Sequence, residues 1–218
     1  TFNAFEIEEV TTFEGDDIFD IKVLPNRAHD ALGHRGMARD MCALAGITFV
    51  DPHVYYHGDA SDKVVPPSVV TKDKEACPRF MSVRMDGVQV TESPKWLKDR
   101  LQSIGQKSIN SVVDITNYVQ FCLNKPMHAY DAENIAGNTL VARYAKRGEK
   151  LTTLDDKELK LDNETLVIAD ADKPLGLAGI KGGKFSGISD TTTSIILESA
   201  NFHPTLIRKT AQKYGIRT

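Results

Sequence analysis

The sequence has few cysteines and lacks the short motifs that mark common cofactor and hydrolase sites. Its 218 residues include three cysteines, Cys42, Cys77 and Cys122. Because their number is odd and their spacing wide, we expect reduced thiols and neither a disulfide framework nor a zinc site. No GxxxxGK(S/T) loop and no GxGxxG fingerprint occurs, so nothing predicts ATP binding by this chain. GxSxG and HExxH are also absent, which removes two common hydrolase signatures.

Long apolar runs and a charge surplus are lacking as well. No apolar stretch approaches the roughly 18 residues of a membrane span, and residues 1–4 lack the basic start of a secretion signal. We therefore expect a soluble, cytoplasmic protein with no membrane partner. The formal net charge is -3 and the pI about 6.1, whereas nucleic-acid-binding domains often have a pI above about 9. Any contact with RNA must therefore be local.

The segments of the chain predict an α+β fold, a sheet-sandwich core with helices packed outside. Strand-like and helix-like stretches interleave without regular beta–alpha alternation, which argues against a parallel doubly wound sheet. Apolar periodicity predicts strands at 17–24, 81–86, 140–145, 159–161, 165–170, 175–180 and 194–198. It predicts helices between 30 and 46, between 93 and 105, from 110 to 123 and from 204 to 214.

The sequence also predicts the caps of two helices and the alternation of one strand. Asp30 is a good N-cap for the first helix, and Gly46 a good stop. Ser93 and Pro94 suit the N-cap and first position of the second helix. Met81, Val83 and Met85 alternate with polar residues, as in a half-buried strand.

His128 and Glu198 are the two most suggestive chemistry-bearing residues. His128 follows a helix in the stretch 126–131, which we interpret as a loop, and there it could act as a general base or a hydrogen-bond donor. It could equally bond only the loop backbone. Glu198 ends an apolar strand, where burial of a carboxylate is costly without a partner. Such a position suits an acceptor for a ligand hydroxyl.

Five glycines crowd a short stretch of the sequence between His128 and Glu198. They let the backbone approach a ligand or a neighbouring strand closely. The five are Gly176, Gly179, Gly182, Gly183 and Gly187.

Metal binding is a weaker interpretation at two places. Asp30 and His34 lie one helical turn apart, next to His29, but one turn rarely supplies a whole site. A metal-dependent hydrolase could instead use a second set of residues, which matches no metal signature. That set is His128, Asp131, Glu198 and His203. We predict no metal site.

Eight phrases of the sequence, in this order, resemble the beta subunit of bacterial phenylalanyl-tRNA synthetases, in its central editing domain of the B3/B4 type. Each phrase alone is weak, but together they cover the chain from about residue 17 to its end. They are 25–27 (PNR), 36–39 (GMAR), 93–97 (SPKWL), 113–119 (VDITNYV), 126–131 (PMHAYD), 178–183 (AGIKGG), 197–200 (LESA) and 214–218 (YGIRT).

The resemblance implies a domain that binds the amino acid attached to tRNA and hydrolyses tyrosine wrongly joined to phenylalanine tRNA. The family's reader of the tyrosine hydroxyl falls on Glu198. Its orienting residues fall on His128, Thr116 and Asn117, with no covalent nucleophile. The remaining substrate-binding positions are Ala178, Gly179, Gly182 and Thr218.

The resemblance also implies the cofactors and partners. The domain itself needs no cofactor, whereas ATP and Mg²⁺ serve the whole synthetase. Its partners are tRNA(Phe) mischarged with tyrosine and the alpha subunit, in an assembly of two alpha and two beta chains. We expect one editing domain over residues 1–218, a fragment of a longer beta subunit, with a division at 1–70 and 71–218. The alternative is a non-catalytic scaffold that only binds tRNA.

Overall fold

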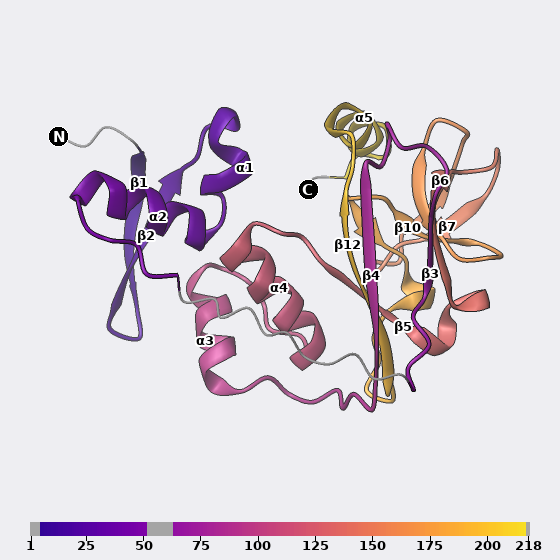
Figure 1. Ribbon diagram of the computed structural model, residues 1–218, viewed down its shortest axis with the longest axis horizontal. Coiled ribbons are helices and arrows are strands. Elements are labelled where there is room, and N and C mark those ends of the chain that lie inside the picture. Colours follow the sequence, from indigo (N-terminus) through magenta and orange to yellow (C-terminus); the bar gives the residue numbers. More distant parts are fainter. Residues whose placement is uncertain (1–4, 52–62, 217–218) are drawn as a thin grey trace. The chain divides into compact units, whose positions relative to one another are not determined.

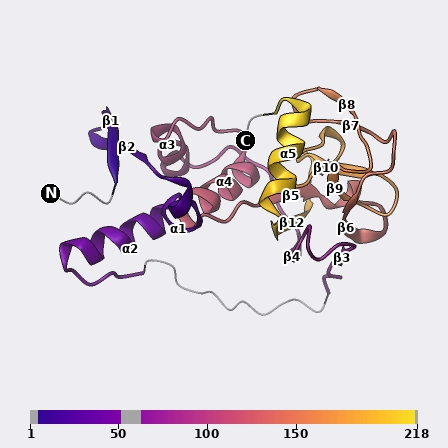
Figure 2. The ribbon, with the colours of Figure 1, turned by 90° about the horizontal axis from the view of Figure 1, so that it is seen from above.

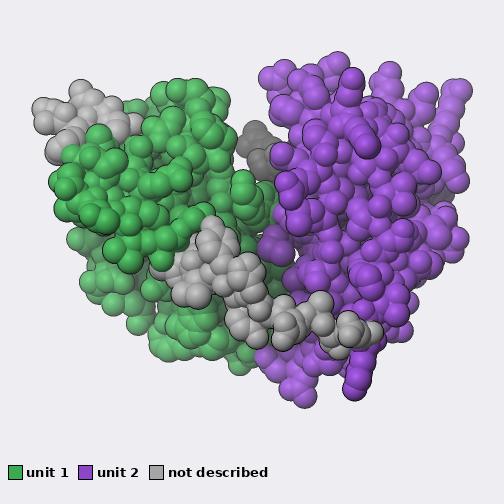
Figure 3. All heavy atoms as spheres, viewed as in Figure 1, with its two compact units in different colours: residues 1–59, 92–126 green, residues 60–91, 127–218 purple. Residues whose placement is uncertain are grey.

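The chain forms two compact units (Figure 3). The computed structural model describes residues 5–51 and 63–216. Unit 1 comprises Thr1–Asp59 and Glu92–Pro126, and unit 2 comprises Ala60–Thr91 and Met127–Thr218. This division differs from the one expected near residue 70. Residues 92–126 belong with the N-terminal segment, because their second helix packs against the helix at 34–45.

Unit 1 combines a β-hairpin with a group of helices. Glu14 and Gly15 at the hairpin tip both have positive φ, 51° and 89°, as a two-residue hairpin turn requires. The elements of unit 1 are β1 (Glu6–Phe13), β2 (Asp16–Lys22), η1 (Pro25–Arg27), α1 (Ala28–Ala31), α2 (His34–Ala45), α3 (Lys95–Ser103) and α4 (Ser111–Leu123).

Two predicted N-caps are wrong. Asp30 lies inside α1, where the Arg27 guanidinium donates to both of its carboxylate oxygens at 3.2 and 2.9 Å. The next helix, α2, begins instead after Gly33, and it ends as predicted at Gly46, which is left-handed. The N-cap of α3 is Pro94 and not Ser93, because the Ser93 hydroxyl is taken by another partner.

That partner is Asp114, the most deeply buried carboxylate of unit 1. Asp114 lies on α4, and its side chain is fully inaccessible to water. It accepts hydrogen bonds from the hydroxyls of Ser93 and Ser108, both at 2.6 Å, and from the backbone N–H of Ile109 at 2.8 Å. Three donors compensate the desolvation of the carboxylate. Asp114 thereby ties α4 to the segments before and after α3.

Unit 2 contains the sheets and the last helix. Its elements are β3 (Ser68–Thr71), β4 (Arg79–Asp86), β5 (His128–Asp131), η2 (Ala132–Asn134), η3 (Ala136–Asn138), β6 (Thr139–Tyr144), β7 (Lys150–Thr152), β8 (Glu158–Lys160), β9 (Leu166–Ala169), β10 (Pro174–Leu177), β11 (Lys181–Gly182), η4 (Lys184–Ser186), β12 (Ser194–Asn201) and α5 (Pro204–Tyr214).

Two sheets face each other in unit 2, which confirms the predicted α+β fold with a sandwich core (Figure 1). One has the order β4-β12-β5 and is antiparallel; the other has the order β11-β10-β9-β6-β3, with β3 parallel to β6. The main core lies between them, with Tyr130 and Ile196 from the first sheet and Leu140 and Leu166 from the second. The β7–β8 hairpin covers the other face of the larger sheet with a second cluster that includes Leu151.

The last helix, α5, packs against the sandwich as predicted. It lies against β9 (Figure 2). Leu206 and Ile207 contact the main core, and Tyr214 contacts the second cluster. This one amphipathic helix therefore covers part of both hydrophobic clusters.

Two predictions about strands of the smaller sheet are wrong. Residues 128–131 form β5 and not a loop, because they pair with β12. β4 is a strand as expected, but Met81, Val83 and Met85 are its exposed residues, at 52, 51 and 46% of their surface. Ser82 and Arg84, which alternate with them, are half-buried on the opposite face of the strand.

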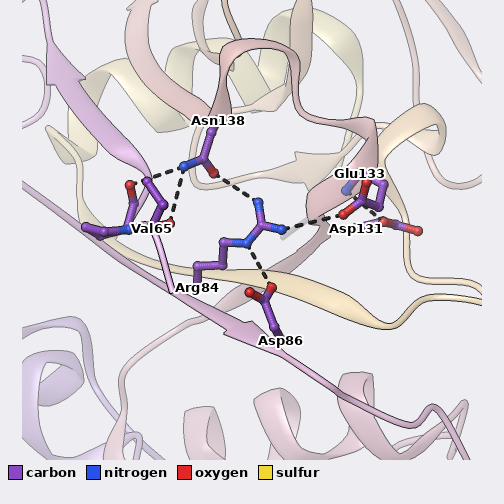
Figure 4. Close-up of polar contacts among 7 residues, drawn as sticks. Val65, Arg84, Asp86, Asp131, Glu133 and Asn138 are labelled. Atoms are coloured by element: carbon purple, nitrogen blue, oxygen red, sulfur yellow. Dashed lines mark hydrogen bonds and ion pairs between the residues drawn. The ribbon is translucent and has the colours of Figure 1, made fainter. Parts of the chain in front are cut away.

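One of these inward residues is Arg84, whose guanidinium joins several segments (Figure 4). It donates to Asp86 at 2.8 Å, to the Asn138 side chain at 3.3 Å and to Glu133 at 3.5 Å. Asn138 in turn donates to the carbonyl of Val65. The network links β4 to η2, η3 and the segment before β3.

Two further observations concern the described part of the chain. Cys42, Cys77 and Cys122 are all free thiols, and Cys77 is the buried one. Within residues 5–51 and 63–216, no helix combines the length and apolar character needed to span a membrane.

We expect Asp114→Ala to destabilise unit 1 by about 3 kcal/mol, because it leaves three donors, among them the buried Ser93 hydroxyl, without their acceptor. Trp96, the only tryptophan of the chain, lies on α3 of this unit, so urea unfolding followed by its fluorescence measures the effect. Asp99→Ala is the matched control, since Asp99 forms a surface ion pair with Lys95. Equal unfolding midpoints for the two variants would contradict the role of Asp114.

Candidate functional site

Strand register places three polar residues in one row across the smaller sheet. Glu198 on the central strand β12 lies directly opposite Ser82 on β4 and directly opposite His128 on β5. Directly paired residues of antiparallel strands point to the same face, with Cβ atoms about 5 Å apart. Ile196 and Tyr130 form the next pair of β12 and β5 on this face, and both belong to the main core. The row therefore faces the interior of the sandwich.

Glu198 is a buried carboxylate in the middle of its strand. The prediction ended this strand at residue 198, but β12 continues to Asn201, and Glu198 is 7% exposed. The Tyr130 hydroxyl donates to Glu198 Oε2 at 2.5 Å. Burial raises the pKa of Glu198 to about 7, although the hydrogen bond from Tyr130 acts in the opposite direction. The carboxyl group therefore titrates near neutral pH.

His128 contributes a buried nitrogen without a partner. The residue as a whole is half-buried, but its Nε2 has no access to water and no hydrogen-bond partner. Because the charged imidazolium is disfavoured by burial, the pKa of His128 is lowered to about 4. The ring is therefore neutral near pH 7. A buried polar atom without a partner is unusual in a folded protein and indicates a place for a ligand or water.

Gly182 provides the space that the His128 ring occupies. A Cβ atom at position 182 would lie 2.6 Å from His128 Cε1 and 2.7 Å from His128 Nε2. These distances are shorter than any normal contact between carbon or nitrogen atoms. The predicted close approach of this glycine is thus realised, and its neighbour is the histidine.

The other glycines of the stretch allow close backbone packing. A Cβ at Gly183 would lie 2.3 Å from the Leu175 carbonyl oxygen, and one at Gly176 would lie 3.0 Å from that of Lys181. Both contacts join β10 to β11 or its continuation. The glycines therefore allow the close pairing of β10 and β11 at the edge of the larger sheet, in addition to the close approach at His128.

Two further predicted site residues, Ala178 and Gly179, have other neighbours within unit 2. Ala178 is buried in the main core. Gly179 is left-handed, with φ of 65°, and its nearest neighbour is the Phe202 ring. Thr218 lies outside the described residues. Ala178 and Gly179 thus lie by the core and α5, not beside His128.

Thr116 and Asn117 lie on α4 of unit 1, whereas His128, Glu198 and Gly182 belong to unit 2. The Thr116 hydroxyl donates to the Val113 carbonyl at 2.7 Å, within its own helix. A shared role of this pair with His128 stays a prediction.

Ser82 and Tyr130 are the members of the site that the sequence did not reveal. Ser82 Oγ is buried and has no hydrogen-bond partner. Tyr130 is 2% exposed and contacts both Glu198 and the His128 ring. The alternation of β4 contains Ser82, but alternation alone does not say which face is buried.

The alternative set of His128, Asp131, Glu198 and His203 is not gathered as metal ligands in the described chain. Between residues 5 and 51 and between 63 and 216, no group of three or more His, Cys, Asp and Glu side chains is placed to hold a metal ion. Asp131 is instead satisfied by the Thr192 hydroxyl at 2.7 Å.

The arrangement combines groups with complementary chemistry. Near pH 7 the site holds a neutral imidazole and a carboxyl group close to its midpoint. The imidazole can accept or donate a proton, and the carboxylate can accept a hydrogen bond from a hydroxyl group. Two titratable groups shifted by burial in one place are typical of a functional site.

Comparison with known proteins relates most of the chain to one family. The B3/4 domain family matches residues 76–218. The phenylalanine–tRNA ligase beta subunit of Aquifex aeolicus is 43% identical over 204 residues, which are 94% of this chain and 25% of that protein. The corresponding beta subunit of Geobacter metallireducens is 42% identical over 207 residues, which are 93% of this chain and 25% of that protein.

The chain thus spans about a quarter of the length of these curated relatives. Among solved structures, an N-terminal fragment of the phenylalanyl-tRNA synthetase beta subunit from Pyrococcus horikoshii matches 97% of this chain and 65% of its own. Its TM-score is 0.49 and its sequence identity 13%.

We expect Gly182→Ala to displace the His128 ring and to destabilise unit 2 by about 1 to 3 kcal/mol, because the new methyl group overlaps the ring. The His128 ring resonances in a proton–nitrogen spectrum report the displacement directly. Gly187→Ala is the matched control, since its Cβ would meet nothing closer than 3.3 Å. Unchanged His128 resonances in Gly182→Ala would contradict the contact.

We expect Glu198→Gln to stabilise the chain more at pH 8 than at pH 4. The pKa of Glu198 is about 7 in the folded chain against the ordinary value of 4.5, so the unfolded chain ionises first and the wild-type protein loses stability between pH 4.5 and 7. Glutamine cannot ionise, and the difference in unfolding free energy should grow by about 3 kcal/mol across this window.

Urea unfolding at several pH values measures this difference. Glu158→Gln, at an exposed position of β8, is the control and should give a flat difference. A flat difference for Glu198→Gln too would mean that its carboxyl group ionises as in water.

Proposed function

The chain belongs to the B3/4 domain family, and from this premise we propose that it is the editing part of a phenylalanine–tRNA ligase beta subunit. In this proposal it binds the aminoacyl end of tRNA(Phe) mischarged with tyrosine. It then hydrolyses the ester that joins tyrosine to the tRNA. Supporting features are the match of residues 76–218 to the family and the row of His128 and Glu198 on the inner face of the smaller sheet.

The single observation that supports this function best is the buried carboxylate of Glu198. A 7% exposed glutamate with a pKa of about 7 costs stability, and sites of binding and catalysis are where such costs are retained. A carboxylate in a partly dry environment is a strong acceptor for a phenol hydroxyl. Glu198 therefore suits the recognition of tyrosine over phenylalanine.

Discrimination between tyrosine and phenylalanine favours a second site that forms a hydrogen bond with the tyrosine hydroxyl. A phenylalanine site rejects tyrosine only by withholding space and partners from its hydroxyl. A site that hydrogen-bonds the hydroxyl instead rejects the substrate lacking it, because its own buried polar group is then left unpaired. Phenylalanyl-tRNA would leave Glu198 without this donor.

Hydrolysis in this proposal needs orientation and not a covalent nucleophile. His128 is neutral near pH 7 and has a free buried Nε2, so it can orient the substrate or an attacking water. Thr116 and Asn117, the family's orienting pair, would act with it. The free hydroxyl of the terminal ribose would assist the water. Fixed donors and acceptors can supply several kcal/mol of the barrier.

The proposal extends to the parent protein. The domain itself would need no cofactor, while ATP and Mg²⁺ would serve the synthetic reaction elsewhere. The alpha subunit and tRNA(Phe) would be its partners, in the cytoplasm. The scaffold alternative assigns tRNA binding alone to the same fold, and it predicts no dependence of ester hydrolysis on Glu198.

We expect Glu198→Ala, in the assembled ligase that contains this chain, to slow deacylation of tyrosyl-tRNA(Phe) by one to two powers of ten. The lost interaction is a charge-assisted hydrogen bond of about 1.5 to 3 kcal/mol. Phenylalanine charging should remain close to normal. The measurement is release of labelled tyrosine from preformed tyrosyl-tRNA.

Two further variants sharpen this experiment. Glu198→Gln should cost less than Glu198→Ala if a neutral acceptor suffices, and nearly as much if the charge is needed. Glu158→Ala, an exposed glutamate of the same unit, should have no effect. Normal deacylation by Glu198→Ala would favour the scaffold alternative.

A further inference from the structure

Tyr130 occupies a position that links the two main residues of the site. It lies on β5 two residues after His128, on the same face, and it pairs with Ile196 of β12. Its side chain is 2% exposed and belongs to the main core. The ring is therefore fixed by packing on all sides and cannot swing out without opening the sandwich.

The Tyr130 hydroxyl contacts the carboxylate of Glu198. It donates to Oε2 at 2.5 Å, and both side chains are buried. No water competes for a bond formed in such a place, and a charged acceptor strengthens it further. The bond holds one carboxylate oxygen in a fixed direction and leaves Oε1 with its own lone pairs.

The Tyr130 ring also contacts His128. The two ring centroids are 4.5 Å apart, and the planes meet at 84°. This edge-to-face geometry is a favoured aromatic arrangement. The β11 backbone at Gly182 also approaches the imidazole closely, so the ring has both Tyr130 and β11 as neighbours.

We propose that Tyr130 is a positioning residue of this site, which aims the Glu198 carboxylate and the His128 ring so that Glu198 reads a phenol hydroxyl with its second oxygen. This inference rests on the proposed function. The arrangement is a carboxylate between two phenols, one built into the core and one supplied by the ligand. Tyr130 touches no reacting atom and acts through its two neighbours.

The opposite interpretation is that Tyr130 blocks Glu198 and must be displaced by the ligand. The burial of Tyr130 argues against this interpretation. Displacement would require a core tyrosine to move and its hydroxyl to lose its partner in a dry environment. A carboxylate offers about four acceptor positions, so a second hydroxyl can bind without removing the first.

The bond from Tyr130 also influences when Glu198 is charged. It stabilises the carboxylate and lowers the pKa of Glu198, against the larger effect of burial. The described titratable groups that face Glu198 are Tyr130 and His128 on β5 and Cys77 ahead of β4. His128 is neutral near pH 7, and burial raises the pKa of the Cys77 thiol. Among these neighbours, Tyr130 is therefore the one that favours the ionised form of Glu198.

The test is Tyr130→Phe in the assembled ligase, with deacylation of tyrosyl-tRNA(Phe) measured from pH 6 to pH 9 after subtraction of the uncatalysed rate. Loss of the donor should raise the midpoint of the pH dependence by on the order of one unit. The rate should fall about fivefold at pH 7 and recover toward pH 9, as expected when the charged fraction decreases accordingly. A residue that only fills space would lower the rate without moving the midpoint.

Tyr144→Phe is the matched control. Tyr144 is a partly buried tyrosine that packs against the same core, and its hydroxyl lies near Asp73 and not near Glu198. The same loss of one hydroxyl should leave the midpoint unchanged. In a Glu198→Gln background, Tyr130→Phe should no longer change the shape of the pH profile, because no carboxyl group remains to titrate.

A second measurement does not depend on activity. Carbon NMR of the labelled glutamate carboxyl groups in the 218-residue chain follows Glu198 directly, and its midpoint should rise in Tyr130→Phe. An unchanged midpoint in that spectrum, or an unchanged pH profile of deacylation, would overturn the positioning role. Failure of the proposed function gives a different result, namely normal deacylation by Glu198→Ala.

Discussion

The pairing of β12 with both of its neighbours is the constraint on which the site depends. β12 pairs with β4 over eight residues and with β5 over four. Since side chains alternate between faces, a shift of one residue would turn Glu198 out of the sandwich and bring Leu197 in. Both neighbouring strands hold the same register, so the polar row and the apolar core are specified together.

With the strands in this register, contacts among the polar side chains of the site offset part of the cost of burying them. Glu198 and His128 are both pushed toward their neutral forms by desolvation. Tyr130 partly opposes this for the carboxylate, whereas His128 Nε2 and Ser82 Oγ have no protein partner. The row is thus a polar strip inside an apolar core. Such a strip lowers stability unless a ligand or water completes its hydrogen bonds.

The sequence predicted much of the fold because local signals and tertiary structure agree there. The helix predicted from 110 to 123 is α4, whose first turn the Asn110 side chain caps, and the predicted close backbone approach is realised at Gly182. β5 was missed, because His-Ala-Tyr-Asp has no clear alternation and pairs with a strand about 70 residues away. The inward face of β4 was also misjudged, since Ser82 and Arg84 are partly covered by neighbours that no local pattern reveals. Asp30 was assigned as a cap, but Arg27 forms a stronger contact with it.

The position of β12 in the chain has a consequence for folding during synthesis on the ribosome. β12 lies between β4 and β5 in space, but it is synthesised about 110 residues after β4 ends. At roughly 5 to 20 residues per second, β4 waits several seconds or longer for its partner. During that time the edge of β4 that later pairs with β12 has no partner strand, which is a period of risk for mispairing. The smaller sheet, and with it the row of Ser82, Glu198 and His128, can assemble only after β12 has been synthesised up to Asn201.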